Sequence, residues 1–120
     1  MARKTGHTII GVVGPCAAGK STLIEALNKL DITAKHIAQE HSYVPTMWER
    51  LTSPDILIFL DVSFEESMKR RKQSWTLADY QEQHHRLRHA RQRANLYLDT
   101  TNLTPEDVLA KILQVIENNE

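Results

Sequence analysis

The sequence predicts an α/β fold in which a small, mostly parallel sheet is flanked by helices. Strand-like and helix-like segments alternate along the chain, which is typical of a parallel sheet with helical crossovers. The strand-like residues 8–13 and 56–60 are almost wholly apolar, as expected for strands buried on both faces. The helix-like segments begin with capping residues, and the last one carries a one-sided apolar stripe.

The elements follow one another as strand, helix, strand, helix, strand, helix, helix, strand, helix. Strands are predicted at residues 8–13, 34–38, 55–62 and 96–98. Helices are predicted at residues 20–29, 46–51, 63–72, 76–93 and from residue 104 onward. Parallel sheets bind ligands at the carboxyl ends of their strands, so the residues directly after each strand form the candidate site.

The length of 120 residues predicts a single domain, residues 1–120, with one modest core. Cys16 is the only cysteine, so no internal disulfide can form and a reducing compartment is indicated. No apolar run approaches the roughly 20 residues of a membrane-spanning helix, and residues 1–7 do not resemble a secretion signal. We therefore expect a cytoplasmic protein without a membrane partner.

The charges balance overall, with 15 basic and 15 acidic residues, but they are unevenly distributed. Residues 69–93 contain eight basic residues and two acidic ones, so this segment has a net charge of +6. The excess predicts that the segment meets an anion. The alternative is a helix face that is charged only because it is solvated.

Residues 14–21 match the phosphate-binding pattern GxxxxGK[ST], also called Walker A, between a predicted strand and a predicted helix. Glycines permit close approach of the backbone, and the loop amides and the helix N-terminus then bind phosphate. Lys20 would neutralise the β- and γ-phosphates, and the Ser21 hydroxyl would ligate Mg²⁺. The predicted nucleotide-binding residues are Gly14, Pro15, Cys16, Ala17, Ala18, Gly19, Lys20, Ser21 and Thr22. The fold expectation narrows to a three-layer P-loop NTPase fold.

A second motif is a decoy. Residues 28–31 read NKxD, which selects guanine in regulatory GTPases. Lys29 lies eight residues after Ser21, roughly 12 Å along the helix at about 1.5 Å per residue. The motif therefore points away from the phosphates, and we reject a regulatory GTPase.

With the P-loop placed, two later segments resemble the adenylate-kinase-like group, which includes nucleotide, shikimate and gluconate kinases. Residues 60–71 resemble the passage from a strand into the lid, and residues 96–108 resemble the last strand and closing helix. The resemblance implies a lid-like helical segment at about residues 69–94. It also implies that Arg70 or Arg71 closes on the transferred phosphoryl group, and that residues 99–102 lie near the nucleotide base.

The middle of the chain departs from that group. Residues 32–54 are short for a substrate-binding segment and lack the Asp and Arg pair expected at a strand end. The nearest substitute is Glu40, which would lie beside the P-loop if its strand neighbours the first one. We predict that Glu40 assists catalysis and holds the Mg²⁺ shell with Ser21; Asp61 is the alternative carboxylate, weighted towards a structural role. Histidines 36, 41, 84, 85 and 89 are expected to be solvated.

Three functions remain open. The first is a Mg²⁺-dependent kinase that transfers the γ-phosphoryl group of ATP or GTP to a small acceptor. A nucleoside or nucleotide is the acceptor that we expect. Its catalytic residues would be Lys20, Glu40, Arg70 and Arg71. The second is a non-catalytic nucleotide-binding or slow NTPase module, which the short middle segment favours. The third is a polynucleotide kinase, although no aromatic residue interrupts the basic residues 86–93. A chain this short would also complete its site as a homodimer.

Overall fold

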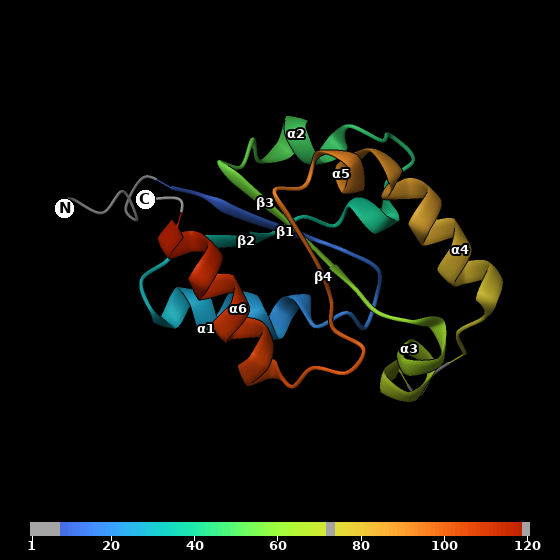
Figure 1. The fold of residues 1–120 in the computed structure, drawn as a ribbon. Coiled ribbons are helices and arrows are strands. Elements are labelled where there is room, and N and C mark those ends of the chain that lie inside the picture. The colour runs from blue at the N-terminus through green and yellow to red at the C-terminus, as the bar shows by residue number, and fades with distance from the viewer. Residues whose placement is uncertain (1–7, 72–73, 119–120) are drawn as a thin grey trace.

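The computed structural model describes residues 8–71 and 74–118, which contain a four-stranded, all-parallel sheet (Figure 1). Its strands are β1 (Ile10–Val13), β2 (Ala34–His36), β3 (Ile56–Asp61) and β4 (Leu96–Asp99). They lie in the order β2-β1-β3-β4, so β1 is held between β2 and β3. The predicted α/β class is confirmed. The strand that precedes Glu40 does neighbour β1, as the interpretation of Glu40 required.

Helices flank the sheet on both faces (Figure 1). They are α1 (Lys20–Lys29), α2 (Met47–Leu51), α3 (Phe64–Arg71), α4 (Leu77–Arg86), α5 (Arg88–Arg93) and α6 (Pro105–Asn118), with a 3₁₀ turn η1 (Gln39–His41). In Figure 1, α1 and α6 lie on one side of the sheet and α2 and α5 on the other, while α3 and α4 lie beyond the carboxyl ends of the strands. No helix in the described ranges is long and apolar enough to cross a membrane.

The larger core joins the sheet to α1 and α6. Ile10 and Ile58 of adjacent strands are fully buried, and Leu27 of α1 and Ile112 of α6 pack against the same cluster. The apolar stripe of α6 is thereby accounted for. Truncating such a side chain to alanine costs about 2–5 kcal/mol, so this layer fixes the position of α1 and of the loop before it.

The smaller core lies on the opposite face. Phe59 and Val13 project from β3 and β1 towards Trp48 of α2, together with Leu87 and Ala90 at the start of and within α5. Trp48 is a core residue, with 6% of its surface exposed. This second layer completes the three-layer arrangement and fixes the segment that follows β2.

Two predicted boundaries are wrong. The strand expected at residues 34–38 ends at His36, because the chain turns into η1. The helix expected at residues 76–93 is two helices that meet at Leu87, where φ is −94° and ψ is 0°. The break lets Gln83 of α4 face the loop after β1, while Leu87 and Ala90 face the sheet. A single straight helix could not direct Gln83 towards the loop and also direct Leu87 and Ala90 towards the sheet.

The helix caps agree with the sequence at one position and only in part at another. Thr76 and Asp79 form the complete reciprocal capping box that begins α4. At α3, Ser63 Oγ accepts from the Glu66 amide, which is half of such a box. Glu66 does not reach back, because its carboxylate contacts Arg70, and the Ser63 amide donates instead to Thr101.

Candidate functional site

The loop of residues 14–19, called the glycine loop below, connects the central strand β1 to α1. A side chain at Gly14, where φ is +153°, would place its Cβ 2.0 Å from the Leu60 carbonyl oxygen, so this position excludes every residue except glycine. Gly19 has φ +97° but nothing lies within 4 Å of where its Cβ would stand. Gly14 therefore brings the loop close to β3, whereas Gly19 combines a left-handed turn with an open face.

The beginning of α1 presents unneutralised positive potential to that open face. Its N-cap, Gly19, offers no side-chain cap, and the first turn contains no acidic residue. Ser21 and Thr22 are exposed there. The first amides of a ten-residue helix and its dipole favour an anion at this end.

Lys20 is buried, with 6% of its surface exposed, and its ammonium group is held within the loop. Nζ donates to the carbonyl oxygens of Gly14 at 2.6 Å and Pro15 at 2.9 Å. It also lies 3.1 Å from Glu40 Oε2. The structure thus brings together two of the predicted catalytic residues, which lie 20 positions apart in the sequence.

Glu40 is positioned by its neighbour Gln39. The Gln39 side chain is 1% exposed and spans three backbone groups. It donates to Val44 O and Arg86 O and accepts from the Trp48 amide. These bonds fix η1 beside the glycine loop. Nothing in the sequence singled out Gln39, since a glutamine in a polar loop carries no signal of burial.

The Glu40 carboxylate is only half satisfied. Its side chain is 3% exposed, and Oε1 is buried without a hydrogen-bond partner. The Nε2 atoms of His36 and His41 lie 3.8 and 3.7 Å from Oε2. Partial burial and the Lys20 ammonium lower the pKa of His36, although Glu40 opposes them. Lys20, at 3.1 Å, is the cation nearest to the Glu40 carboxylate, and Oε1 remains available to a ligand.

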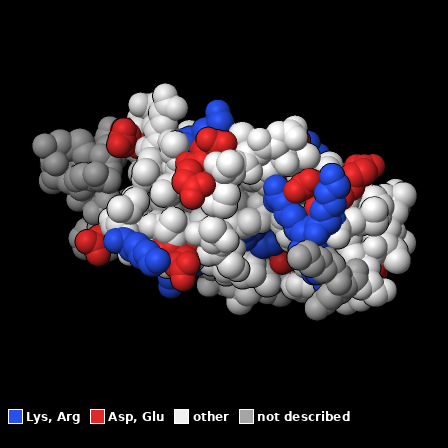
Figure 2. Space-filling view, turned by 90° about the horizontal axis from the view of Figure 1, so that it is seen from below, with Lys and Arg blue, Asp and Glu red and all other residues white. Residues whose placement is uncertain are grey.

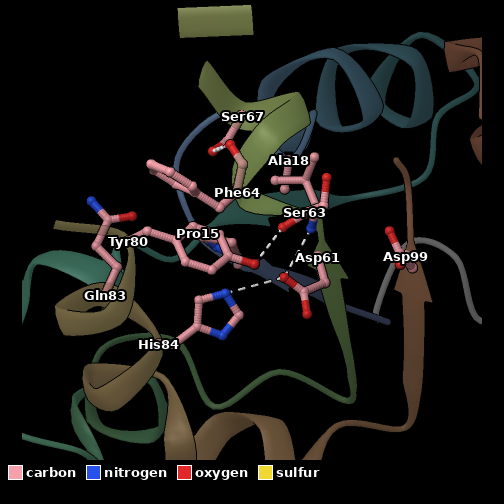
Figure 3. Close-up of polar contacts among 12 residues, drawn as sticks. Pro15, Ala18, Asp61, Ser63, Phe64, Ser67, Tyr80, Gln83, His84 and Asp99 are labelled. Carbon is pink, nitrogen blue, oxygen red and sulfur yellow. Dashed lines mark hydrogen bonds and ion pairs between the residues drawn. The ribbon is translucent and has the colours of Figure 1, made fainter. Parts of the chain in front are cut away.

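Asp61, the alternative carboxylate, has contacts at both oxygens, and Figure 3 shows its contact with His84. Oδ1 accepts from the Val62 amide at 2.8 Å and lies 3.3 Å from His84 Nε2, while Oδ2 accepts from Tyr97 Oη at 2.5 Å. Burial alone would raise the pKa of Asp61, but the contacts from His84, Tyr97 and Val62 outweigh it and the pKa is lowered. Asp61 is thus a structural carboxylate at the base of α3 and α4.

The two candidate arginines lie in different places. Arg70 donates to the Ala17 carbonyl oxygen at 2.9 Å and to Thr100 O at 2.8 Å, with Glu66 on its third side. It therefore ties α3 to the glycine loop and to the turn after β4. The Arg71 guanidinium stacks 4.7 Å from the Trp75 ring centre, and its Nε is buried without a hydrogen-bond partner.

A cavity of about 320 Å³ opens beside the glycine loop. Its wall includes Ala17, Gly19, Thr22, Arg70, Thr100 and Pro105. This volume is at the lower end of the usual range for small-molecule sites, about 300–1,000 Å³. The turn after β4, expected near a nucleotide base, does form part of this wall.

A second hollow of about 270 Å³ lies between the end of α3 and α4. Arg71, Trp75 and Arg86 line it together with Asp79 and Glu82. Two guanidinium groups and an indole line it, and the two carboxylates balance the charges of the guanidinium groups. The hollow can therefore receive a polar molecule with a flat ring.

Gln83 is a contact that the sequence did not reveal. Its side-chain oxygen accepts from the Cys16 amide at 2.9 Å, and its Nε2 donates to Cys16 Sγ at 3.1 Å. The polar centre of residues 81–86 hinted that this helix is not packed on a core. The structure gives the reason, because a buried glutamine there binds the glycine loop.

Two expectations about histidines are corrected. His84 is not solvated, since it stands half-buried against Asp61 (Figure 3). His89 Nδ1 accepts from Trp48 Nε1 at 3.1 Å. Asn28 of the NKxD decoy bonds to the backbone of Ala34 and joins α1 to β2, which agrees with its rejection as a base-selecting motif.

No known protein family matches the chain, and no curated protein matches it. The interpretation of the site therefore depends on the motif, the geometry and the chemistry of these side chains.

Proposed function

We propose that the protein is a Mg²⁺-dependent P-loop kinase that transfers the γ-phosphoryl group of ATP or GTP to a small acceptor, a nucleoside or nucleotide. The P-loop NTPase fold and membership of the adenylate-kinase-like group belong to the same proposal. The observation that carries it is the buried Lys20–Glu40 contact of 3.1 Å at the end of a glycine loop. A buried ammonium and a half-satisfied carboxylate at that place fit phosphoryl transfer better than a purely structural role.

Nucleotide binding would use both sides of the loop. The base would enter the 320 Å³ cavity, against Thr100 and Pro105. The phosphates would then meet the loop amides and the N-terminus of α1. Lys20 would exchange the Gly14 and Pro15 carbonyl oxygens for phosphate oxygens, which carry full charge and bind an ammonium more strongly.

The residues present fit a Mg²⁺ ion. Glu40 offers the buried oxygen Oε1, which has no partner, and Ser21 offers an exposed hydroxyl in the first turn of α1. Hard oxygen ligands of this kind, completed by phosphate oxygens and water, are those that Mg²⁺ prefers. When bound, the ion would neutralise the charge that develops on the phosphate oxygens.

The acceptor would be held on the other side of Glu40. The hollow lined by Trp75, Arg71 and Arg86 can receive a ring and a polar group, and the Arg86 guanidinium also donates to the Glu40 carbonyl oxygen at 3.3 Å. The Glu40 carboxylate is then placed to accept a proton from an acceptor hydroxyl. Arg71, whose guanidinium stacks on Trp75, would be the arginine that approaches the transferred group, whereas Arg70 would position the loop and the base cavity.

The test is a transfer assay. The protein is incubated with labelled ATP or GTP, Mg²⁺ and a panel of nucleosides, monophosphates and small hydroxy acids. We expect acceptor-dependent transfer that is lost in Lys20→Ala and kept in Lys29→Ala, a matched change at the exposed far end of α1. Binding of nucleotide without transfer to any acceptor would overturn the kinase.

That outcome would support the second candidate, a nucleotide-binding or slow NTPase module. Two observations favour it. Only η1 and the five-residue α2 lie between β2 and β3, which leaves little chain for an acceptor domain. Gln83 also already occupies the Cys16 amide, so the loop is closed by contacts within the protein.

A polynucleotide kinase is the least supported reading. Seen from below in Figure 2, basic and acidic side chains lie next to each other over α3, and the described residues of this face form no continuous basic surface. Arg70 and Arg86 are paired with Glu66 and Glu82. Nucleic-acid binding depends on unpaired positive charge along a groove.

A further inference from the structure

Three side chains of metal-binding type meet beside the glycine loop. Cys16 comes from the loop, and Glu40 and His41 come from η1. One ligand atom of each, the Cys16 sulfur, a Glu40 carboxylate oxygen and a His41 ring nitrogen, lies within 4.8 Å of the others. This cluster could not be predicted from the sequence, because 24 positions separate Cys16 from Glu40 and His41 was expected to be solvated.

A second observation points to a ligand at the same place. Glu40 is buried, with 3% of its side chain exposed, yet Oε1 has no hydrogen-bond partner. A buried carboxylate oxygen left without a partner is unfavourable, and native proteins retain one chiefly where a ligand, ion or water completes it. His41 is 61% exposed in its side chain, so the cluster is open on that side.

We propose that Cys16, Glu40 and His41 bind a borderline divalent transition metal, with Zn²⁺ as the best match, through one sulfur, one oxygen and one nitrogen. Thiolate, carboxylate and imidazole are the three ligand types of Zn²⁺ in proteins, and three protein ligands with an open position are typical of non-structural zinc sites. Mg²⁺ does not accept a thiolate, so this donor set distinguishes the proposed site from the Mg²⁺ site that Glu40 and Ser21 would form.

The neighbouring groups are compatible with the metal. Gln83 Nε2 donates to Cys16 Sγ at 3.1 Å, a hydrogen bond that stabilises a thiolate once its proton has passed to solvent. Lys20 is the opposing charge, 3.1 Å from Glu40 Oε2. Its ammonium also has the Gly14 and Pro15 carbonyl oxygens as acceptors, so it keeps partners when the carboxylate turns to the metal.

Metal binding would tie η1 to the glycine loop. The cluster joins the segment after β2 to the segment after β1, and it uses the carboxylate that Lys20 otherwise contacts. The metal site itself does not depend on the proposed kinase activity, since it is defined by the protein without nucleotide.

The test uses the tag-free protein without nucleotide and Co²⁺ as a spectroscopic substitute for Zn²⁺. We expect one Co²⁺ per chain, a thiolate-to-cobalt charge-transfer band, and loss of the band when Zn²⁺ is added. Cys16→Ser should abolish the band, and His41→Ala should weaken binding roughly tenfold or more. His85→Ala, an exposed histidine of α4, is the matched control and should bind as the wild type does.

The absence of a charge-transfer band in the wild type would overturn the proposal. So would a band that persists in Cys16→Ser, or equal binding by His41→Ala and His85→Ala. Thermal unfolding of each variant confirms that it is folded. Glu40→Gln provides a second probe, because it keeps the shape of the side chain while removing the charged ligand, and it should also weaken Co²⁺ binding.

Discussion

Glu40, which follows β2, and Asp61, which ends β3, are buried carboxylates beside the two strands that flank β1, and they differ in how well their oxygens are satisfied. Their exposed fractions are 2% and 7%. Asp61 has contacts at both oxygens, from Val62, His84 and Tyr97. Glu40 has Lys20 at one oxygen and no hydrogen-bond partner at the other. Position and burial therefore do not distinguish the carboxylate that we propose to be functional from the structural one, whereas hydrogen-bond satisfaction does.

The difference follows from what each carboxylate holds in place. Asp61 lies where β3 leads into α3, and Tyr80 of α4 donates to the adjacent Val62 carbonyl oxygen at 2.7 Å (Figure 3). Partial burial of its ring and the hydrogen bond to Asp61 raise the pKa of Tyr97, so this phenol stays a donor beyond the range of an ordinary tyrosine. Glu40 is held by the backbone contacts of Gln39, which leaves its own carboxylate free to change partners.

The largest expected effect separates the two carboxylates by activity. Glu40→Gln should lower the rate of phosphoryl transfer by about 10²–10³-fold, the usual cost of removing one preorganised electrostatic group. Asp61→Asn should leave the rate within a few-fold of the wild type at temperatures where it is folded. Initial rates at saturating nucleotide and acceptor measure both. Equal losses of transfer rate in the two variants would contradict the proposal that Glu40 is functional and Asp61 structural.

The loss of stability should be larger in Asp61→Asn than in Glu40→Gln, the reverse of the expected losses of activity. Asp61→Asn should reduce the free energy of unfolding by about 1.5–3 kcal/mol, because an amide group cannot accept from Tyr97 and Val62 and also attract His84. Glu40→Gln should cost less, since an amide oxygen still accepts from Lys20. Urea unfolding followed by tryptophan fluorescence gives both values. A larger loss for Glu40→Gln would show that its contact with Lys20 is the structural one.

The stability of the fold at acidic pH should also depend on Asp61. Its pKa is lowered in the folded protein, despite the opposing effect of burial, by the His84, Tyr97 and Val62 contacts. An unfolded aspartate has a pKa of about 3.9, so this stabilisation is complete above that pH and is lost as the pH falls through the lower, folded value. The difference in unfolding free energy between wild type and Asp61→Asn should therefore shrink below about pH 4. A difference that stays constant between pH 7 and pH 3 would contradict it.

The sequence predicted the order of the elements and the glycine loop because these depend on local patterns. Strand periodicity, the glycines and the caps at Thr76 all act within a few residues. It also placed Glu40 beside the loop, through the topology of a parallel sheet. It did not predict Gln39, Gln83 or the approach of His41 to Cys16, because these contacts depend on tertiary packing. From the sequence alone, a glutamine that becomes buried cannot be distinguished from an exposed one, because its backbone partners lie far away in the chain.

The smallest expected effect concerns Gln83, which satisfies part of the same loop. Its oxygen accepts from the Cys16 amide, one of the donors that phosphate would otherwise use. Gln83→Ala should free that amide and raise nucleotide affinity about two- to tenfold, since one such hydrogen bond contributes about 0.5–1.5 kcal/mol. Gln81→Ala, an exposed change on the same helix, is the matched control. Fluorescence titration with a labelled nucleotide gives both dissociation constants. If Gln83→Ala binds the nucleotide more weakly than Gln81→Ala does, the prediction is wrong. Gln83 then contacts the nucleotide itself, and α4 forms a wall of the nucleotide site.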